Sequence, residues 1–348
     1  MKKVTRVSFV LFGFMALLWS CKKDETAAVS GPTPYQLQIP QGLPAMNIPA
    51  SNPLTVEGIA LGRKLFYDPI LSGDNTQSCG SCHMAEHSFV DGTQFSVGIT
   101  GAVGTRNVMP LVNLGYQPGF FWDGGAADLE SQVIGPIQNP VEMHETLENC
   151  LQELRNHDEY PELFEKAFGE NSVTIPNLMK AIAQFERTMI SGNSRYDQYL
   201  RGEATLTSNE LRGLDLFFDF DKGDCSHCHV IGSTFSDFAY RNTGLDSISE
   251  DLGRMAITQN EFDRGKFKTP SLRNIALTGP YMHDGRFQTL LECVQHYNTG
   301  FHYAANLDFN LQLATKGRMT DEEMGYIVEF MLTLTDEEFI NNPAFRPE

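Results

Sequence analysis

The chain has 348 residues and a formal net charge of −18 at pH 7. Its hydrophobic fraction of 41% is typical of globular proteins, which excludes the disordered and fibrous classes, and its length allows two domains of ordinary size. So acidic a surface repels polyanions, which argues against nucleic acid as a partner. It favours a basic protein partner, although selection for solubility explains the charge equally well.

The first twenty residues differ from the rest of the chain. Three cations precede a short apolar run at residues 9–18, which is too short to cross a bilayer. The pattern predicts a secretory signal peptide over residues 1–20, with an uncleaved membrane anchor as the alternative. The run ends in Leu-Trp-Ser-Cys, which resembles a bacterial lipobox apart from the bulky Trp19. We therefore expect a lipid on Cys21, no other link to a membrane, and a location in the periplasm or cell envelope.

The rest of the chain reads as helices and loops. Residues 21–53 are rich in Pro, Ser, Thr and Gln, which predicts a tether. Apolar residues at helical spacing predict helices at 55–67, 129–134, 147–156, 160–168, 175–190, 209–218, 290–297 and 321–333. No stretch has the alternation of a strand, and frequent Gly and Asn predict a loop at residues 91–125.

Two pentapeptides carry the chemistry: Cys-Gly-Ser-Cys-His at residues 79–83 and Cys-Ser-His-Cys-His at residues 225–229. Cys-x-x-Cys-His is the attachment signature of c-type haem, in which two thiols bond to the porphyrin and the His becomes an axial iron ligand. A single copy could also be a redox pair or half of a zinc site. Two copies, each followed by His, predict two covalently bound haem c groups. The attachment residues are Cys79, Cys82 and His83, and Cys225, Cys228 and His229.

Each motif follows a predicted helix, which indicates a quasi-repeat. We therefore predict an all-α fold of two domains with extensive loops, residues 54–203 and residues 204–348, each resembling a cytochrome c domain. Two other cysteines, Cys150 and Cys293, could pair in an oxidising compartment or remain as buried thiols.

A more specific resemblance covers the chain from about residue 53 to residue 335. Here it resembles the bacterial di-haem cytochrome c peroxidases, including their MauG-like branch. The blocks that carry this resemblance lie at residues 61–68, 106–107, 121–124, 135–137, 141–143, 267–274 and 280–285. The resemblance implies reduction of hydrogen peroxide at the first haem. Electrons would come through the second haem from a small cytochrome, a cupredoxin or another donor, and a homodimer is left open.

The resemblance also implies roles for three residues near the first haem. Glu142 would move a proton between the two oxygens of peroxide, with Gln132 beside it, for roughly 10²–10⁴ in rate. Trp122 matches a Trp between the two haems, where an indole could relay electrons. The alternative for Trp122 is plain core packing.

A calcium site is implied as well. Asn107 and the backbone carbonyls of Thr278 and Pro280 match the family's inter-domain calcium position, and hard oxygen ligands suit this ion. An Asn in a loop is also a common turn former. His87 follows His83 by four residues, but a second ligand must reach the opposite haem face, so we expect His87 to be a surface or packing residue.

Two departures from the family pattern bear on function. Peroxidases that need reductive activation have a His that closes the first iron, and this chain has Ile99 there, which cannot bind iron. Many members have a Met on the second iron, where the matching residue here is Tyr297, as in MauG-like proteins. The rival ligands are Met319 and Met282, and His296 is the nearest neighbour of Tyr297. The segment before the second motif lacks the surface Trp of some MauG-like proteins.

The sequence thus predicts an exported di-haem peroxidase. One alternative is a MauG-like oxidase that uses peroxide to oxidise a protein or small molecule, which Ile99 and Tyr297 favour and the missing Trp disfavours. The other is a non-catalytic electron-transfer cytochrome, which would need two protein ligands on each iron.

Overall fold

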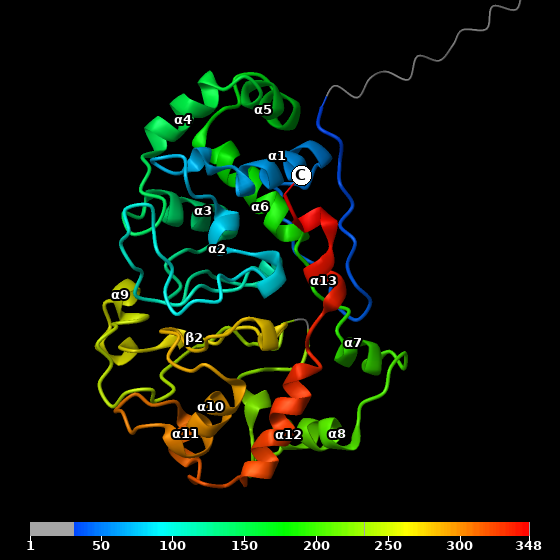
Figure 1. Ribbon diagram of the computed structural model, residues 1–348, viewed down its shortest axis with the longest axis vertical. Coiled ribbons are helices and arrows are strands. Elements are labelled where there is room, and N and C mark those ends of the chain that lie inside the picture. The colour runs from blue at the N-terminus through cyan, green and yellow to red at the C-terminus, as the bar shows by residue number, and fades with distance from the viewer. Residues whose placement is uncertain (1–30, 233, 348) are drawn as a thin grey trace, which may run out of the picture. The chain divides into compact units, whose positions relative to one another are not determined.

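A computed structural model of the protein describes residues 31–232 and 234–347, so the predicted signal peptide and Cys21 lie outside the described residues. The described part is mostly helical (Figure 1), and none of its helices is long and apolar enough to cross a membrane. The α-helices are α1 (Val56–Tyr67), α2 (Cys79–Cys82), α3 (Leu129–Gln138), α4 (Leu147–Asn156), α5 (Tyr160–Phe168), α6 (Ile175–Thr188), α7 (Arg195–Leu200), α8 (Ser208–Phe218), α9 (Met255–Thr258), α10 (Leu290–Gln295), α11 (Phe309–Leu313), α12 (Asp321–Leu332) and α13 (Glu337–Asn341).

The longer helices begin where the sequence predicts, because their first turns are capped. The Thr55 side chain accepts a hydrogen bond from the backbone N–H of Gly58 at the start of α1. Thr207 and Thr320 form capping boxes with the Glu three residues later, at the starts of α8 and α12. The helices α4 and α5 have the predicted bounds.

Several local features differ from the sequence prediction. Helix α3 continues to Gln138, past the predicted end at residue 134, and the short helices α7, α9, α11 and α13 were not predicted. The helix predicted at 290–297 changes after Gln295 into a π-helical turn, His296–Gly300. A small antiparallel sheet joins β1 (Tyr240–Arg241) to β2 (Phe267–Lys268), with Tyr240 opposite Lys268. Two residues are too few to display the alternation that identifies a strand, which is why no strand was predicted.

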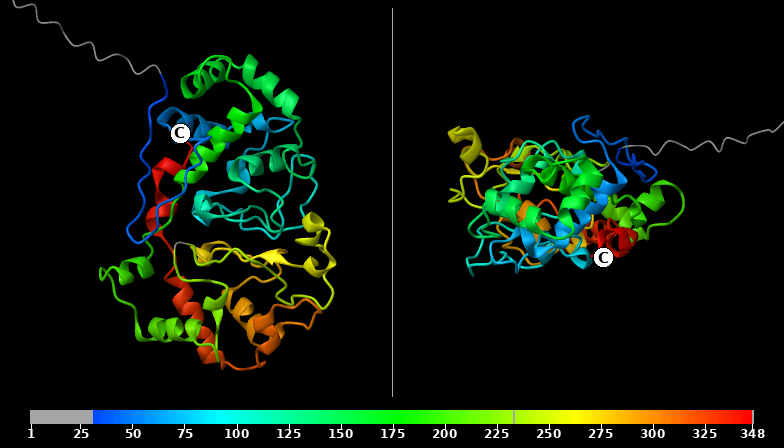
Figure 2. Two further views of the ribbon diagram at one scale, coloured as in Figure 1. Left: turned by 180° about the vertical axis from the view of Figure 1, so that it is seen from behind. Right: turned by 90° about the horizontal axis from the view of Figure 1, so that it is seen from above.

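Two large and separate clusters of buried hydrophobic side chains organise the described part, and a third, small one lies around Phe301. The first core is formed mainly by α1, α3, α4, α5 and α6, and the second by α7, α8, α10 and α12. Figure 1 and the view from behind in Figure 2 display these two groups of helices in separate halves.

The two ends of the described part also pack on these cores. Phe339 and Ile340 of α13 and the nearby Phe345 join the first core, although they follow α12 of the second. Figure 1 shows α13 running back toward α1. Within the segment predicted as a tether, Met46 is buried, and Tyr116 donates a hydrogen bond to the carbonyl of Pro44 at 2.9 Å. From Gly31 onward, this segment therefore contributes buried surface to the fold.

The two cores contain the same helix crossing. A Cβ added to Gly62 of α1 would lie 1.9 Å from the carbonyl oxygen of Ala181 on α6, and one added to Gly213 of α8 would lie 1.9 Å from that of Tyr326 on α12. One turn later, Phe66 packs edge-on against Phe185, with ring centroids 5.4 Å apart. Phe217 and Phe330 repeat this contact in the second core at 5.2 Å. The two helix pairs therefore correspond residue by residue.

We expect Gly62→Ala and Gly213→Ala each to destabilise the protein by about 3 kcal/mol, because the added methyl meets backbone that cannot move without separating the helices. Thermal unfolding of the haem-loaded protein measures this effect. The control is Gly325→Ala in α12, where an added Cβ meets no atom within 4 Å. The free energy of unfolding of Gly325→Ala should rise by up to about 1 kcal/mol, because Ala has a higher helix propensity than Gly. Equal stabilities for all three variants would contradict the close-crossing argument.

Candidate active site

The first haem motif faces a cavity of about 1160 Å³. Its two cysteines lie on α2, and His83 follows as the residue that ends this helix. Helix α3 and the loops on either side of it supply other parts of the lining. The cavity brings together the residues predicted from separate segments, namely Cys79, Cys82, His83, Trp122, Gln132 and Glu142.

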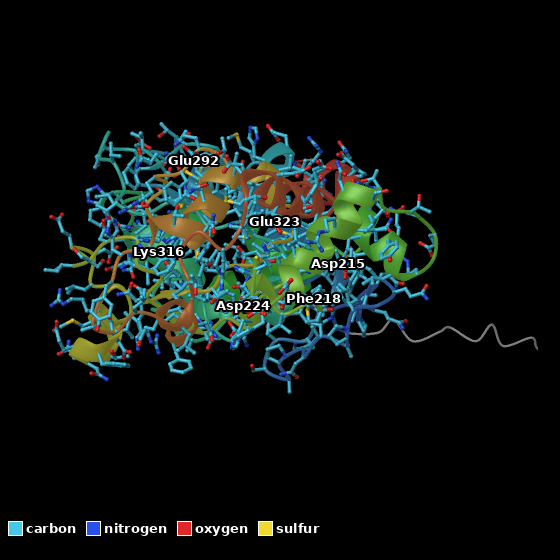
Figure 3. The ribbon with its side chains drawn as sticks, turned by 90° about the horizontal axis from the view of Figure 1, so that it is seen from below. Asp215, Phe218, Asp224, Glu292, Lys316 and Glu323 are labelled. Atoms are coloured by element: carbon cyan, nitrogen blue, oxygen red, sulfur yellow. The ribbon has the colours of Figure 1, made fainter. Side chains whose placement is uncertain are left out.

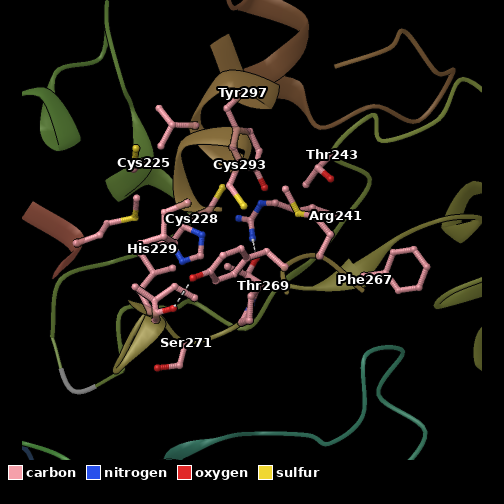
Figure 4. Close-up of a pocket in the computed structure, with 18 of the residues that line it drawn as sticks. Cys225, Cys228, His229, Arg241, Thr243, Phe267, Thr269, Ser271, Cys293 and Tyr297 are labelled. Carbon is pink, nitrogen blue, oxygen red and sulfur yellow. Dashed lines mark hydrogen bonds between the residues drawn. The ribbon is translucent and has the colours of Figure 1, made fainter. Parts of the chain in front are cut away.

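The second motif faces a different cavity. The residues expected at this haem that line it are Cys225, Cys228, His229, Met282, Tyr297 and Met319. Figure 4 shows Tyr297 projecting from its helix into the space near Cys228 and His229. His296, the neighbour of Tyr297 in the chain, is not part of the lining.

Both motif histidines are held in the same way. Nδ1 of His83 donates to the backbone carbonyl of Phe89 at 2.7 Å, and Nδ1 of His229 donates to that of Phe235 at 3.0 Å. Each acceptor follows its His by six residues and has a positive φ, 64° and 51° respectively. These bonds leave Nε2 as the nitrogen available to a metal.

Burial lowers the pKa of both histidines, which favours the neutral imidazole that a metal requires. Two thiols and a neutral imidazole at each cavity are the donor set of c-type haem, so the residues fit this cofactor at both places. The sequence predicted the donors but gave no sign of the carbonyls that orient them.

Glu142 lies in the loop after α3. Nδ2 of Asn139, the residue that ends α3, donates to Glu142 Oε1 at 2.6 Å. Burial raises the pKa of the Glu142 carboxyl, and the bond from Asn139 opposes this shift. The backbone N–H of Ile99 donates to the Glu142 carbonyl at 3.0 Å, which fixes the neighbouring loop to the same segment. Asn139 was not singled out from the sequence, and its position at a helix end gives little sign of this role.

The two cavities share a wall. The residues that line both are Asn107, Val108, Pro110, Trp122, Lys268 and His283. Nε1 of the buried Trp122 donates to the Asn107 carbonyl at 2.8 Å, and the Trp122 carbonyl accepts from the backbone N–H of Lys268 at 2.7 Å. Trp122 therefore has a fixed orientation between the two haem motifs.

The wall also contains a buried amine that was not predicted. Nζ of Lys268 donates to Gln117 Oε1 and to the carbonyl of Gly119, each at 2.8 Å. Burial lowers the pKa of Lys268 to about 7, although the charge of Asp123 opposes the shift. Beside it, the His283 ring stacks on Phe267 with centroids 3.6 Å apart, so the imidazole has a packing partner in the wall.

The comparison with known proteins identifies the family. The family model for di-haem cytochrome c peroxidase matches residues 56–205. A cytochrome c551 peroxidase from Nitrosomonas europaea is 36% identical over 301 residues, which cover 85% of each chain. The chain belongs to the di-haem cytochrome c peroxidase family. It is therefore a peroxidase, an oxidoreductase, and its family implies two haem c groups.

The chain is also similar to the MauG-like branch of the di-haem peroxidases. The methylamine utilization protein MauG of Methylophilus methylotrophus is 31% identical over 330 residues, covering 93% of this chain and 96% of the relative. The crystal structure of a MauG-like protein associated with microbial copper homeostasis has a TM-score of 0.84 and 34% identity, and the match covers 90% of this chain and 99% of that one.

Tyr297, the ligand expected at the second iron, lies in the π-helical turn. Such turns often occur at functional sites because they shift one side chain out of helical register. Nε2 of the buried His296 donates to the Thr243 carbonyl at 3.0 Å and anchors the turn. Burial raises the pKa of Tyr297, and a hydrogen bond with the Thr243 side chain opposes this rise.

The remaining predicted residues have simpler positions in the di-haem peroxidase fold. His87 is exposed. Cys150 is an unpaired thiol in the first core, and Cys293 is an unpaired thiol that lines the second cavity, so the structure contains no bond between them. The residues expected to bind calcium, Asn107, Thr278 and Pro280, all line the second cavity.

Proposed function

We propose that the protein reduces hydrogen peroxide to water in the first cavity with electrons that enter at the second. The observation that carries this proposal is the Glu142 carboxyl, held by Asn139 in the cavity of the first haem motif. The haem iron would supply the centre where peroxide binds and electrons are delivered. The second cavity has the same motif but is lined by Tyr297 and Met319, side chains that can close an iron.

The acid–base work falls to Glu142. Cleavage of the O–O bond needs a proton removed from one oxygen and delivered to the other, which a carboxyl with a pKa near neutral pH can do. Burial raises the pKa of Glu142 and so brings it closer to neutral pH. Asn139 would keep the carboxyl aimed into the cavity, and Gln132 would orient peroxide by a hydrogen bond. Complete reduction consumes two electrons and two further protons per peroxide.

We assign the transfer between the cavities to the shared wall. Trp122 lines both cavities, and its two hydrogen bonds hold the indole in one orientation.

The repeated helix crossing supports two cytochrome c-like domains, residues 54–203 and residues 204–348. The C-terminal Phe339, Ile340 and Phe345 belong to the second domain by sequence but pack on the core of the first. We further propose export to the periplasm or cell envelope, with a lipid on Cys21.

Calcium between the domains is part of the same proposal. Nδ2 of Asn107 donates to the carbonyls of Thr93 and Gln94, at 2.9 and 3.2 Å, so its Oδ1 is the atom turned toward a cation. Thr278 and Pro280, which would add backbone carbonyls, line the same cavity. Neutral oxygens of this kind suit calcium.

The test of this function is the reaction of the fully oxidised protein with peroxide. We expect a high-spin first haem in the electron paramagnetic resonance spectrum and a stopped-flow reaction without prior reduction. The reason is that His83 and His283 are the only histidines in the described lining of the first cavity, and His283 stacks on Phe267. A low-spin spectrum with no reaction until half-reduction would contradict this, and would point to Met109 or Met143, which also line the cavity.

The electron donor would dock beside the second haem motif. Just before this motif lie exposed Phe218 and Phe220, 49% and 62% accessible, among the exposed carboxylates of Asp215, Asp219 and Asp221. We call these five residues the donor face. Figure 3 shows Asp215 and Phe218 on one side of the molecule together with Asp224. Asp224 and Phe217 line the second cavity, so this face is adjacent to it. Its charge suits a basic redox protein.

We expect the triple variant Asp215→Asn, Asp219→Asn and Asp221→Asn to raise the KM for a basic cytochrome by roughly 10-fold at low ionic strength, because steering is lost. The difference should vanish at about 0.5 M salt, where charges are screened. The control neutralises Glu148, Glu162 and Glu165 on α4 and α5, far along the chain from the second motif, and should leave KM unchanged. Equal KM shifts for both triples would contradict docking at the donor face.

One observation favours a second function. Tyr297 lines the second cavity, and an anionic oxygen ligand there would suit a MauG-like oxidase that uses peroxide to oxidise another molecule. The exposed aromatic residues before the second motif are phenylalanines, which cannot carry an oxidising equivalent as Trp can. Peroxide consumption that stays coupled to oxidation of a reduced cytochrome supports the peroxidase.

A further inference from the structure

The repeated helix crossing lets α6 and α12 be aligned residue by residue. Ala181 and Phe185 of α6 meet Gly62 as Tyr326 and Phe330 of α12 meet Gly213. The alignment pairs Ile182 with Ile327, and each of these lines the cavity of its own haem motif.

The residue after the paired phenylalanines differs in chemistry. Glu186 follows Phe185 and lines the first cavity, whereas Met331 follows Phe330 and lines the second. Both side chains are buried, with 4% and 6% of their surface accessible. A position that is apolar in the second half therefore carries a carboxyl in the first half, where peroxide chemistry is proposed.

This carboxyl lacks the partners that a buried charge needs. Among the described residues, Glu186 Oε2 has no hydrogen-bond partner. The neighbouring Arg187 forms two bonds to Glu130, at 2.7 and 2.8 Å. Burial raises the pKa of Glu186 to about 8, although Arg187 lowers it and Glu130 raises it. An unpaired carboxyl at such a position costs free energy and is best stored as the neutral acid.

Other charged groups near α6 are directed elsewhere. Glu130 on α3 is bonded to Arg187, and Tyr116, which precedes α3 in the chain, is bonded to the carbonyl of Pro44. The groups on α1 also have partners: Glu57 is bonded to Thr33, Arg63 to the carbonyls of Arg346 and Pro343, Lys64 to Glu159, and Tyr67 to the carbonyl of Phe345. Cys79 on α2 is one of the thiols of the first motif. Lys180 on α6 itself lies nearly two turns before Glu186. Glu142 in the same lining accepts a bond from Asn139, whereas the buried Glu186 Oε2 accepts none among the described residues.

We propose that Glu186 is a proton-loading residue, which takes up a proton when the first haem is reduced and releases it when that haem is reoxidised. The inference rests on the proposed function. Ferric iron carries one more positive charge than ferrous iron, so it favours the Glu186 carboxylate, and reduction favours the neutral acid. Each hydrogen peroxide takes two electrons from the donor and two protons from water to give two waters. Every one-electron reduction of this haem removes one unit of positive charge, so each reduction by the donor favours uptake of a solvent proton by Glu186, and each oxidation by peroxide favours its release into the cavity.

The proposed coupling of proton uptake to reduction predicts that the reduction potential of the first haem depends on pH. If reduction raises the pKa of Glu186, protonation stabilises the reduced state, so the reduction potential of the first haem falls as pH rises between the oxidised-state and reduced-state pKa values. The slope should approach one proton per electron between these two pKa values. The second haem, with Met331 at the paired position, provides an internal comparison in the same sample.

The experiment is a spectroelectrochemical titration of both haems in the loaded protein at a series of pH values, with no peroxide present. The wild-type first haem should display the slope, and Glu186→Gln should lose it while the slope of the second haem is unchanged. Glu186→Met places the second-half residue in the first half, so its fit has a precedent in Met331, and it should lose the slope as well. Reduced-minus-oxidised infrared spectra should gain a carboxylic acid C=O band that is absent from Glu186→Gln.

A wild-type potential independent of pH across this series overturns the proposal, as does an unchanged slope in Glu186→Gln. Glu142→Gln separates the two cavity carboxyls: it should keep the Glu186 slope, and loss of that slope would assign the proton to Glu142 instead. Because the titration contains no peroxide, a protein with the predicted slope but no peroxide turnover would overturn the proposed function and leave the redox-linked proton in place.

Discussion

Replacing Glu142 by Gln should slow peroxide turnover by about 10²-fold or more, the scale of a lost proton shuttle. The amide has nearly the same size as the carboxyl and can still bond to Asn139, so the cavity should keep its shape. It cannot take a proton from one peroxide oxygen and return it to the other. Stopped-flow measurement of the reaction with peroxide, before any donor is added, isolates this step.

Two further variants are needed to interpret this measurement. Glu148→Gln, an exposed Glu on α4, is the matched control and should react at the wild-type rate. Asn139→Ala removes the 2.6 Å bond that holds Glu142, so it should slow the reaction less than Glu142→Gln does. It should also alter the pH profile, because the bond from Asn139 lowers the pKa of Glu142. If Glu142→Gln reacted with peroxide at the wild-type rate, Glu142 would not be the proton shuttle.

Local signals account for what the sequence could predict. The helices α4 and α5 matched their predicted bounds because apolar spacing, a Thr cap and a final Gly occur within the segments themselves. The haem motifs were equally local, since the thiols and the imidazole lie within five residues. Glu142 and Gln132 could be placed in one cavity with the first motif only through a family resemblance.

Contacts between distant segments account for what the sequence could not predict. The π-helical turn at Tyr297 depends on the bond from His296 to Thr243, which lies on a loop more than fifty residues earlier. Lys268 belongs to a strand of two residues, and its burial follows from Gln117 and Gly119 on the other side of the shared wall. Helical periodicity predicted α6 but could not reveal that Glu186 lacks a partner in the cavity.

Replacing Tyr297 by Phe should raise the reduction potential of one haem by on the order of 0.2 V, within the span of about 0.8 V that axial ligands cover. A phenolate is a hard anionic donor that stabilises ferric over ferrous iron, and Phe removes it while preserving the ring that fills the cavity. Redox titration with optical detection measures the shift. The controls are Met319→Leu and Met282→Leu, which remove the rival thioethers from the same cavity.

The burial of Tyr297 bears on whether its phenol is ionised. Burial raises the pKa of the phenol, so the neutral hydroxyl is favoured unless a cation takes the place of its proton. Iron can be that cation, and the His296 anchor keeps the ring in the cavity either way. If Tyr297→Phe leaves the potential and spectrum unchanged while Met319→Leu lowers the potential, the thioether is the ligand. The second haem would then be a high-potential electron store suited to peroxide reduction. A positive shift of the reduction potential in Tyr297→Phe would instead show that the wild-type second haem has a phenolate ligand and a low potential. Such a haem is a poor store of electrons but can share high oxidation states, which favours oxidation of a further substrate.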